Sequence, residues 1–141
     1  MPMRSVKVAD YMSRKVITLT PETNVVTAIQ TLLSNKISGA PIVDEAGNLV
    51  GILSEVDLMG VIMQDSYYGE AVGVVGDFMH SPVDSIPPDM DIYELAEKFM
   101  REGRRRYPVV REGKLVGQIS RRDVLRAAEA FLTRQPEPAR A

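Results

Sequence analysis

The chain reads LVGILSEVDL at residues 49–58 and LVGQISRRDV at residues 115–124. Each stretch is an apolar run with one glycine, followed by Ser-x-x-Asp and a second run with helical apolar spacing. A serine followed three residues later by an acid is a helix-start signature, so the pattern predicts a strand that leads directly into a helix. Its repetition indicates that one structural unit occurs twice.

Aligning the chain with itself extends the repeat over most of the sequence. Residues 8–45 align with 75–112, and residues 47–59 align with 113–125, with a one-residue slip at Ala46 in a predicted turn. Such agreement at a fixed period indicates an internal duplication. The fourteen identical positions are, in the first copy, Val8, Asp10, Met12, Val16, Pro21, Pro41, Val43, Glu45, Gly47, Leu49, Val50, Gly51, Ser54 and Asp57.

Each copy predicts the element order β-α-β-β-α. An extended segment, VITLT or VDSIP, precedes a helix capped at Thr20 or Pro87, with a proline in its first turn. A hairpin follows, and a second helix opens at Ser54 or Ser120. The first helices should bury apolar faces made of Val25, Ala28, Ile29, Leu32 and Leu33 in one copy and Ile92, Leu95, Ala96, Phe99 and Met100 in the other.

The duplication predicts the domain organisation. Repeat 1 spans residues 6–64, a linker spans 65–74, repeat 2 spans 75–131, and a disordered tail spans 132–141. One copy alone would bury too little surface to be stable. We therefore expect an α/β (α+β) fold in which the two repeats pack sheet face to sheet face with pseudo-two-fold symmetry, leaving equivalent clefts between them.

The composition excludes several classes of site. With 45% hydrophobic and 26% charged residues, the 141-residue chain is typical of soluble globular proteins. It has no cysteine and one histidine, His80, so a disulfide framework, a thiolate or histidine-rich metal site and a histidine-based triad are excluded. We expect no catalytic residues, metal or required cofactor, and no enzymatic activity; His80 is predicted to have a turn or cap role. Without a signal sequence or membrane span, a cytoplasmic location is expected.

The charge is unevenly distributed. Residues 101–126 contain nine arginines and lysines against three acidic residues, a net charge of +6, although the whole chain carries −2. This segment suits an anionic partner or is simply a solvated surface, and the sequence leaves both open. Nucleic-acid binding is disfavoured because we find no recognition helix or aromatic stacking platform and the chain is acidic overall.

The repeated Ser-x-x-Asp has two compatible interpretations. In one, the serine caps the helix. In the other, the strand-to-helix junction presents N–H groups and a short carboxylate that could accept hydrogen bonds from two neighbouring hydroxyls, as in a ribose. Gly51 and Gly117 in the preceding strands indicate close approach of either a ligand or another segment.

The two copies resemble the CBS domain pair, or Bateman module. The resemblance covers about residues 6–130 and rests on Pro-hydrophobic-Val in the hairpin and Gly-x-x-Ser-x-x-Asp, each present twice. It implies a regulatory module that binds an adenosine nucleotide (AMP, ADP or ATP, less favourably S-adenosylmethionine or NAD) between the repeats. It also implies a helix-mediated homodimer that signals to an unknown effector protein or through its own assembly. The alternative is a ligand-free structural oligomerisation module.

The resemblance also implies which residues contact the ligand. Ser-x-x-Asp of one repeat would meet the ribose, the first extended segment of the other would frame the adenine, and basic residues before the Pro-hydrophobic strand would meet phosphate. One cleft would join Ser120 and Asp123 to Ile17 and Thr18, and the other Ser54 and Asp57 to Ser85 and Ile86. The phosphate candidates are Arg105 and Arg106, then Arg104, with Lys36 and Ser38 weaker. Which cleft the arginines serve stays open, as does whether Tyr107 faces core or cleft.

Overall fold

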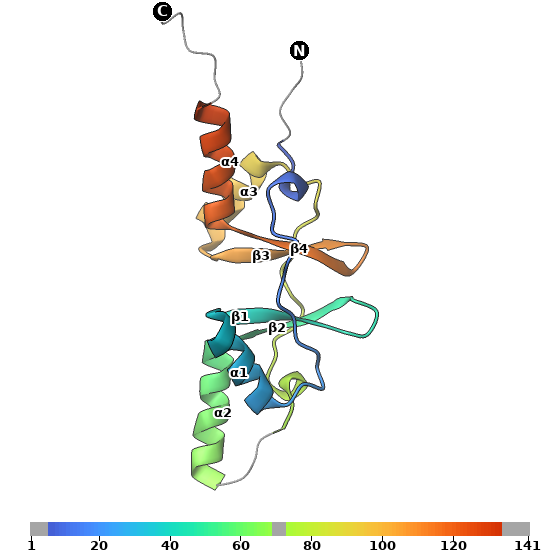
Figure 1. Ribbon diagram of the computed structural model, residues 1–141, viewed down its shortest axis with the longest axis vertical. Helices are drawn as coiled ribbons and strands as arrows, with labels where there is room; N and C mark the ends of the chain where they lie inside the picture. The colour runs from blue at the N-terminus through green and yellow to red at the C-terminus, as the bar shows by residue number, and fades with distance from the viewer. Residues whose placement is uncertain (1–5, 69–72, 134–141) are drawn as a thin grey trace, which may run out of the picture. The chain divides into compact units, whose positions relative to one another are not determined.

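We analysed a computed structural model that describes residues 6–68 and 73–133 (Figure 1). Two similar sets of elements follow each other along this part of the chain, and each set contains two helices and one antiparallel hairpin. The order is η1 (Val8–Asp10), α1 (Val25–Asn35), β1 (Gly39–Val43), β2 (Leu49–Ser54), α2 (Glu55–Tyr68), η2 (Val75–Asp77), α3 (Ile92–Glu102), β3 (Arg106–Arg111), β4 (Lys114–Ser120) and α4 (Arg121–Thr133), where η is a short 3₁₀ helix. The predicted α+β fold class is confirmed.

The compact units do not coincide with the sequence repeats. One unit, the N-unit, comprises the described residues of 17–84 together with 112–115. The other, the C-unit, comprises the described residues of 6–16, 85–111 and 116–133. The segment that begins each sequence repeat therefore belongs to the unit that holds most of the other repeat.

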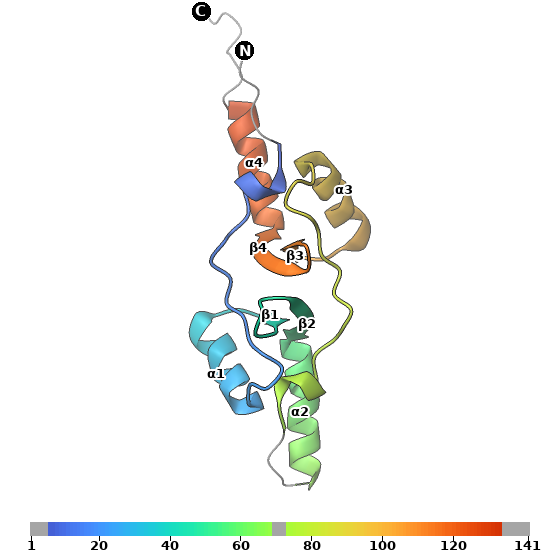
Figure 2. The same ribbon diagram turned by 90° about the vertical axis from the view of Figure 1, so that its right-hand side faces the viewer.

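The N-unit is built on the β1–β2 hairpin. Its strands pair from Gly39 with Ser54 to Val43 with Leu49, and α1 and α2 lie on the same side of the hairpin (Figures 1 and 2). Leu19 forms a single parallel bridge with Ile42, so the predicted first strand is reduced to one bridge beside β1. The core cluster consists of Leu19, Val25, Ala28, Leu32, Ala40, Ile42, Leu53, Leu58, Val61 and Val75.

The C-unit repeats this arrangement on the β3–β4 hairpin. Ile86 bridges Val109 in parallel, as Leu19 bridges Ile42. Tyr107 is fully buried and its hydroxyl donates to Glu102 Oε1 at 2.7 Å, so this ring faces the core. The core cluster consists of Val8, Ile86, Ile92, Leu95, Phe99, Tyr107, Val109, Ile119, Ala127 and Phe131.

Each of the two 3₁₀ segments is hydrogen-bonded to residues that are distant from it in sequence. The Val8 N–H donates to the carbonyl of Met90 at 2.9 Å, and the Val75 N–H donates to the carbonyl of Thr23 at 2.8 Å. Val8 and Val75 are fully buried in their respective cores. Because these positions are equivalent in the two repeats, the same docking occurs twice.

The predicted helix caps are wrong by about one turn. α1 is capped by Asn24 and α3 by Asp91, whose side chains accept hydrogen bonds from the backbone two residues later at 2.7 and 2.6 Å. The carbonyls of the upstream prolines Pro21 and Pro88 are instead occupied by N–H groups of the 3₁₀ segments, at 2.8 Å in both units. These contacts hold the prolines in a turn outside the helix.

Two residues predicted on the buried helix faces are exposed instead. Leu33 is 73% exposed and Met100 is 86% exposed, whereas Val25, Ala28, Leu32, Ile92, Leu95 and Phe99 are buried as predicted. Both exceptions stand in the last turn of their helices, directly after the last buried residue, Leu32 or Phe99.

The strand glycines are explained by another chain segment. A Cβ on Gly51 would lie 2.5 Å from Met79 Sδ and 3.2 Å from the carbonyl oxygen of His80. A Cβ on Gly117 would lie 2.6 Å from Met12 Sδ and 2.8 Å from the carbonyl oxygen of Ser13. Of the two possibilities left open by the sequence, the structure shows close approach by a neighbouring segment.

Two predicted irregular segments lie partly outside the described residues. α2 continues to Tyr68, inside the predicted linker 65–74, of which residues 69–72 are not described. α4 continues to Thr133, and the rest of the predicted tail, residues 134–141, is not described.

Candidate functional site

The two Ser-x-x-Asp motifs start α2 and α4 with the same hydrogen bonds. In the N-unit, Asp57 Oδ2 accepts from the Ser54 backbone N–H at 2.8 Å and from the Ser54 hydroxyl at 3.0 Å. In the C-unit, Asp123 Oδ2 accepts from the same two groups of Ser120 at 2.8 and 3.1 Å. In return, the backbone N–H of each aspartate donates to the serine hydroxyl oxygen, at 3.3 Å in the N-unit and 3.2 Å in the C-unit. Each motif is therefore a reciprocal helix cap.

The other carboxylate oxygen of each motif has a different partner. Asp57 Oδ1 contacts His80 Nε2, whereas Asp123 Oδ1 accepts from Arg126 Nη2 at 3.1 Å. The two aspartate side chains are only 9% and 14% exposed, but the side chains of their partners His80 and Arg126 are 70% and 64% exposed. An exposed side chain thus contacts the outer oxygen in both units.

The arginine-rich segment lies beside the start of α4. The Arg121 side chain donates to the carbonyl oxygens of Arg104 at 2.7 Å and Gly103 at 3.0 Å, and its backbone N–H donates to that of Arg105 at 3.1 Å. Arg104 and Arg105 are exposed, and Arg106 is half-buried at the start of β3. The structure therefore brings the three predicted phosphate contacts next to the strand-to-helix junction that holds Ser120 and Asp123.

The equivalent region of the N-unit is less basic. The Glu55 N–H donates to the Ser38 carbonyl oxygen at 2.9 Å, so Ser38 lies beside the Ser54 junction. Lys36 is exposed and caps α1 in the left-handed conformation, with φ of 55°. One lysine occupies the region that carries three arginines in the C-unit.

The predicted adenine-framing residues are divided between the units. Ile17 and Thr18 are exposed in the N-unit, while Ser85 is half-buried and Ile86 is buried in the C-unit. Each predicted cleft joins residues of both units, and these pairings stay predictions.

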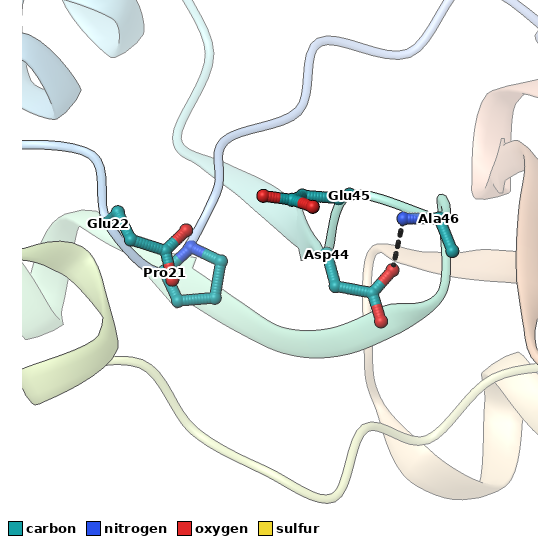
Figure 3. A pocket seen from close by; sticks show the side chains of 5 residues that line it. All are labelled: Pro21, Glu22, Asp44, Glu45 and Ala46. Carbon is teal, nitrogen blue, oxygen red and sulfur yellow. Dashed lines mark hydrogen bonds between the residues drawn. The ribbon is translucent and has the colours of Figure 1, made fainter.

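A surface hollow in the N-unit is lined by none of the predicted site residues (Figure 3). It is lined by Pro21, Glu22, Asp44, Glu45 and Ala46. Hydrogen bonds from the Asn48 side chain and backbone, and then from the Ala46 N–H, lower the pKa of Asp44. An acidic hollow of this kind does not suit a phosphate.

Sequence reasoning missed the outer partners of the two aspartates. Two backbone hydrogen bonds between His80 and Ile52, at 2.9 and 3.0 Å, hold His80 beside β2. This pairing is non-local, so no local sequence signal shows it. Arg126, in contrast, stands three residues after Asp123 on one helix face, and that spacing could have indicated the contact.

The comparison with known protein families agrees with the internal duplication. The CBS domain model matches residues 8–64 and again residues 75–130. This chain belongs to the CBS domain family. The resemblance inferred from its two Gly-x-x-Ser-x-x-Asp motifs is confirmed.

Proteins similar to this CBS pair include both unassigned and ligand-bound examples. The chain is 32% identical over 84% of its length to the uncharacterized protein MJ1225 of Methanocaldococcus jannaschii, of which it spans 41%. It is 29% identical to CBSX2 of Arabidopsis thaliana, solved in complex with AMP, with a TM-score of 0.78 over 91% of this chain and 99% of that one. The CBS domain pair of protein MJ0100 was solved with 5′-methylthioadenosine and S-adenosyl-L-methionine. It is 25% identical, with a TM-score of 0.72 over 91% of this chain and 99% of that one.

Proposed function

We propose that this CBS pair is a regulatory module that binds an adenine nucleotide and transmits its presence to an effector protein or to its own assembly. One observation carries the proposal: both repeats place a shielded aspartate at a strand-to-helix junction, with one oxygen fixed by the cap and the other facing an exposed, displaceable side chain. Family members that carry AMP, 5′-methylthioadenosine or S-adenosyl-L-methionine support this class of ligand.

The ribose would bind at the outer oxygens of Asp57 and Asp123. A carboxylate oxygen can accept two hydrogen bonds, and the cap already uses Oδ2 for two. Oδ1 is therefore the acceptor with capacity for sugar hydroxyls once His80 or Arg126 moves aside. In this proposal Ser54 and Ser120 hold the carboxylates in position.

The phosphate would bind at the arginine-rich segment. Guanidinium groups contact phosphate in a planar, bidentate manner and stay charged at all physiological pH values. We assign Arg105 and Arg106 to this role, followed by Arg104, with Lys36 and Ser38 as the weaker counterpart. The adenine would be framed by Ile17 and Thr18 for the Asp123 site and by Ser85 and Ile86 for the Asp57 site.

Thermal unfolding with a ligand panel tests the proposal. A ligand at about 100 times its dissociation constant stabilises a protein by about 2.7 kcal/mol, which corresponds to about 5–10 °C for a chain of this size. AMP, ADP, ATP, S-adenosylmethionine and NAD form the panel. The shift should shrink in Asp123→Asn and Arg106→Ala but persist in Arg111→Ala, an exposed arginine at the far end of β3. A panel without any shift would refute the proposal.

The alternative, a ligand-free oligomerisation module, is favoured by the apolar surface of α2. Val56, Met59, Ile62 and Met63 are all exposed on this helix, and positions 56, 59 and 63 share one face. We propose that this face forms a homodimer interface, because exposed apolar patches commonly mark interaction surfaces. Met59→Glu should convert the dimer to a monomer in light scattering. A dimer that forms normally while no nucleotide binds would favour the alternative.

We propose a regulatory and not a catalytic role, with no metal or required cofactor. In the described part of the chain, no group of three or more acidic or histidine side chains is placed to hold a metal ion. Among the described helices, none combines the length and apolar character that crossing a bilayer would require. The cytoplasmic location remains part of the proposal.

A further inference from the structure

His80 occupies the one oxygen of Asp57 that the helix cap leaves available. Asp57 Oδ2 holds both the backbone N–H and the hydroxyl of Ser54, and Oδ1 faces His80 Nε2. The backbone of His80 is fixed by two hydrogen bonds to Ile52 in β2, but its side chain is 70% exposed. The ring can therefore leave Asp57 without disturbing the backbone.

The C-unit covers its aspartate from a different position. Ser13 is the equivalent of His80 in the repeat alignment, and it makes the same two backbone hydrogen bonds, at 2.8 and 2.9 Å, with Gln118 of β4. Its short side chain contacts the Lys15 carbonyl oxygen at 3.5 Å. The cation on Asp123 is instead Arg126, whose equivalent in α2 is Gly60.

The two repeats thus supply the partner of the aspartate from different positions. In the N-unit it comes from the segment paired with the strand, and in the C-unit it comes from the helix. Where histidine is present the helix position is glycine, and where arginine is present the strand-side position is serine. Each carboxylate keeps one nitrogen-bearing partner. Of the two partners, only histidine changes its charge between about pH 5 and 8, while arginine remains charged throughout.

We propose that His80 is a proton-controlled competitor for the ligand hydroxyls at Asp57, so that nucleoside binding at this site, but not at Asp123, strengthens as the pH rises. This inference rests on the proposed function. A protonated imidazole forms a charge-assisted hydrogen bond to Asp57 that a neutral hydroxyl displaces poorly. A neutral imidazole holds the oxygen less strongly and releases it to the sugar.

The surroundings of His80 within the N-unit favour this direction. The charged residues on the elements beside it are Glu55, Asp57 and Asp65 in the sequence of α2 and Asp77 and Asp84 on its own segment, and β2 carries none. All are acidic, and Asp57 contacts the ring directly. The N-unit elements next to His80 therefore present no described cation that would oppose its protonation.

Adenosine is the probe because it lacks a phosphate, whose own charge would complicate the pH dependence. The Asp57 site is isolated in Asp123→Asn, since asparagine keeps an oxygen acceptor in the cap. Calorimetric titrations at pH 5.5, 6.5 and 7.5 should show affinity rising by up to about fivefold across this range, the span expected from one exposed ion pair. His80→Ser in the same background, which introduces the residue of the other repeat, should bind more tightly at pH 5.5 and show no rise.

The Asp123 site supplies the matched control. In an Asp57→Asn background, Arg126→Gly should strengthen adenosine binding by a similar factor at every pH. An unchanged pH profile in His80→Ser, or weaker binding at all pH values, would overturn the inference while leaving the proposed function intact. Failure of the wild-type chain to bind adenosine at any pH would refute the proposed function itself.

Nuclear magnetic resonance gives a second readout without a mutated site. The chain has a single histidine, so the ring signals are unambiguous. Adenosine should shift the His80 ring signals of the wild type and leave those of Asp57→Asn unchanged. Signals that do not respond in a wild type that binds adenosine would also overturn the inference.

Discussion

Substituting Val8 by alanine should destabilise the half of the molecule that is distant from it in sequence. Val8 lies at the N-terminus of repeat 1, yet its side chain is fully buried in the C-unit core with Ile86 and Ile92. Its N–H donates to the Met90 carbonyl at 2.9 Å. The N-unit core is closed instead by Val75, the equivalent residue of repeat 2.

The magnitude follows from the buried methyl groups. The substitution removes two carbons that are shielded from water, and each contributes about 0.8 kcal/mol of transfer free energy. Incomplete collapse of the cavity adds to this loss, so the free energy of unfolding should fall by about 2–3 kcal/mol. For a chain of this length the melting temperature should fall by about 6–10 °C. Val26→Ala removes the same atoms from an exposed position on α1 and should change little.

Hydrogen exchange followed by mass spectrometry locates the effect. In Val8→Ala, exchange should accelerate in α3, β3, β4 and α4, and α1 and β2 should stay near their wild-type rates. Val75→Ala should give the opposite pattern. Faster exchange in α1 and α2 upon Val8→Ala would show that the N-terminal segment belongs with its own repeat, and the division into units described above would be wrong.

Three further substitutions test local features. Gly117→Ala places a Cβ 2.8 Å from the Ser13 carbonyl oxygen, so it should displace that segment and lower the melting temperature by several degrees, whereas unchanged stability would contradict the close approach. Asn24→Ala removes the α1 cap and should lower the free energy of unfolding by about 1 kcal/mol in denaturant titrations, with Asn24→Asp as the tolerated control. The pKa of Asp44 is lowered by its hydrogen bonds to Asn48, so its contribution to stability is present above the ordinary carboxyl pKa and lost as the pH falls through the lower folded value. Asp44→Asn should therefore flatten the stability profile below about pH 4, and an identical acid profile would refute this.

The hairpins and second helices could be predicted because their signals are local. Turn residues separate the paired strands, and Ser-x-x-Asp marks the start of α2 and α4 at the residue where the structure begins them. The first helix caps could not be predicted in the same way. Pro21 and Pro88 have the composition of a first turn, but their carbonyls bond to 3₁₀ segments more than fifty residues away in sequence. A non-local contact decided the local structure.

The candidate site also contains residues with a local sequence signal and one residue whose contact is non-local. The serines, aspartates and arginines were identifiable because the alignment of the two copies isolates what they share and where they differ. His80 was assigned a turn or cap role because its only unusual feature in the sequence is the absence of a histidine in the other copy. Its contact with Asp57, which stands twenty-three residues earlier in the chain, depends on the pairing of its segment with β2.

The difference between the copies therefore carries more functional information than their identity. In both copies one oxygen of the Ser-x-x-Asp aspartate accepts the hydrogen bonds that cap a helix, and this structural task does not depend on a ligand. The second oxygen has no such structural task, and it is there that the repeats diverge, with His80 in one and Arg126 in the other. Exchange of His80 with serine and of Gly60 with arginine would give the N-unit the C-unit's arrangement. If adenosine binding at Asp57 in this double variant became independent of pH between 5.5 and 7.5, the two positions would account for the divergence; a persistent pH dependence would require another titrating group.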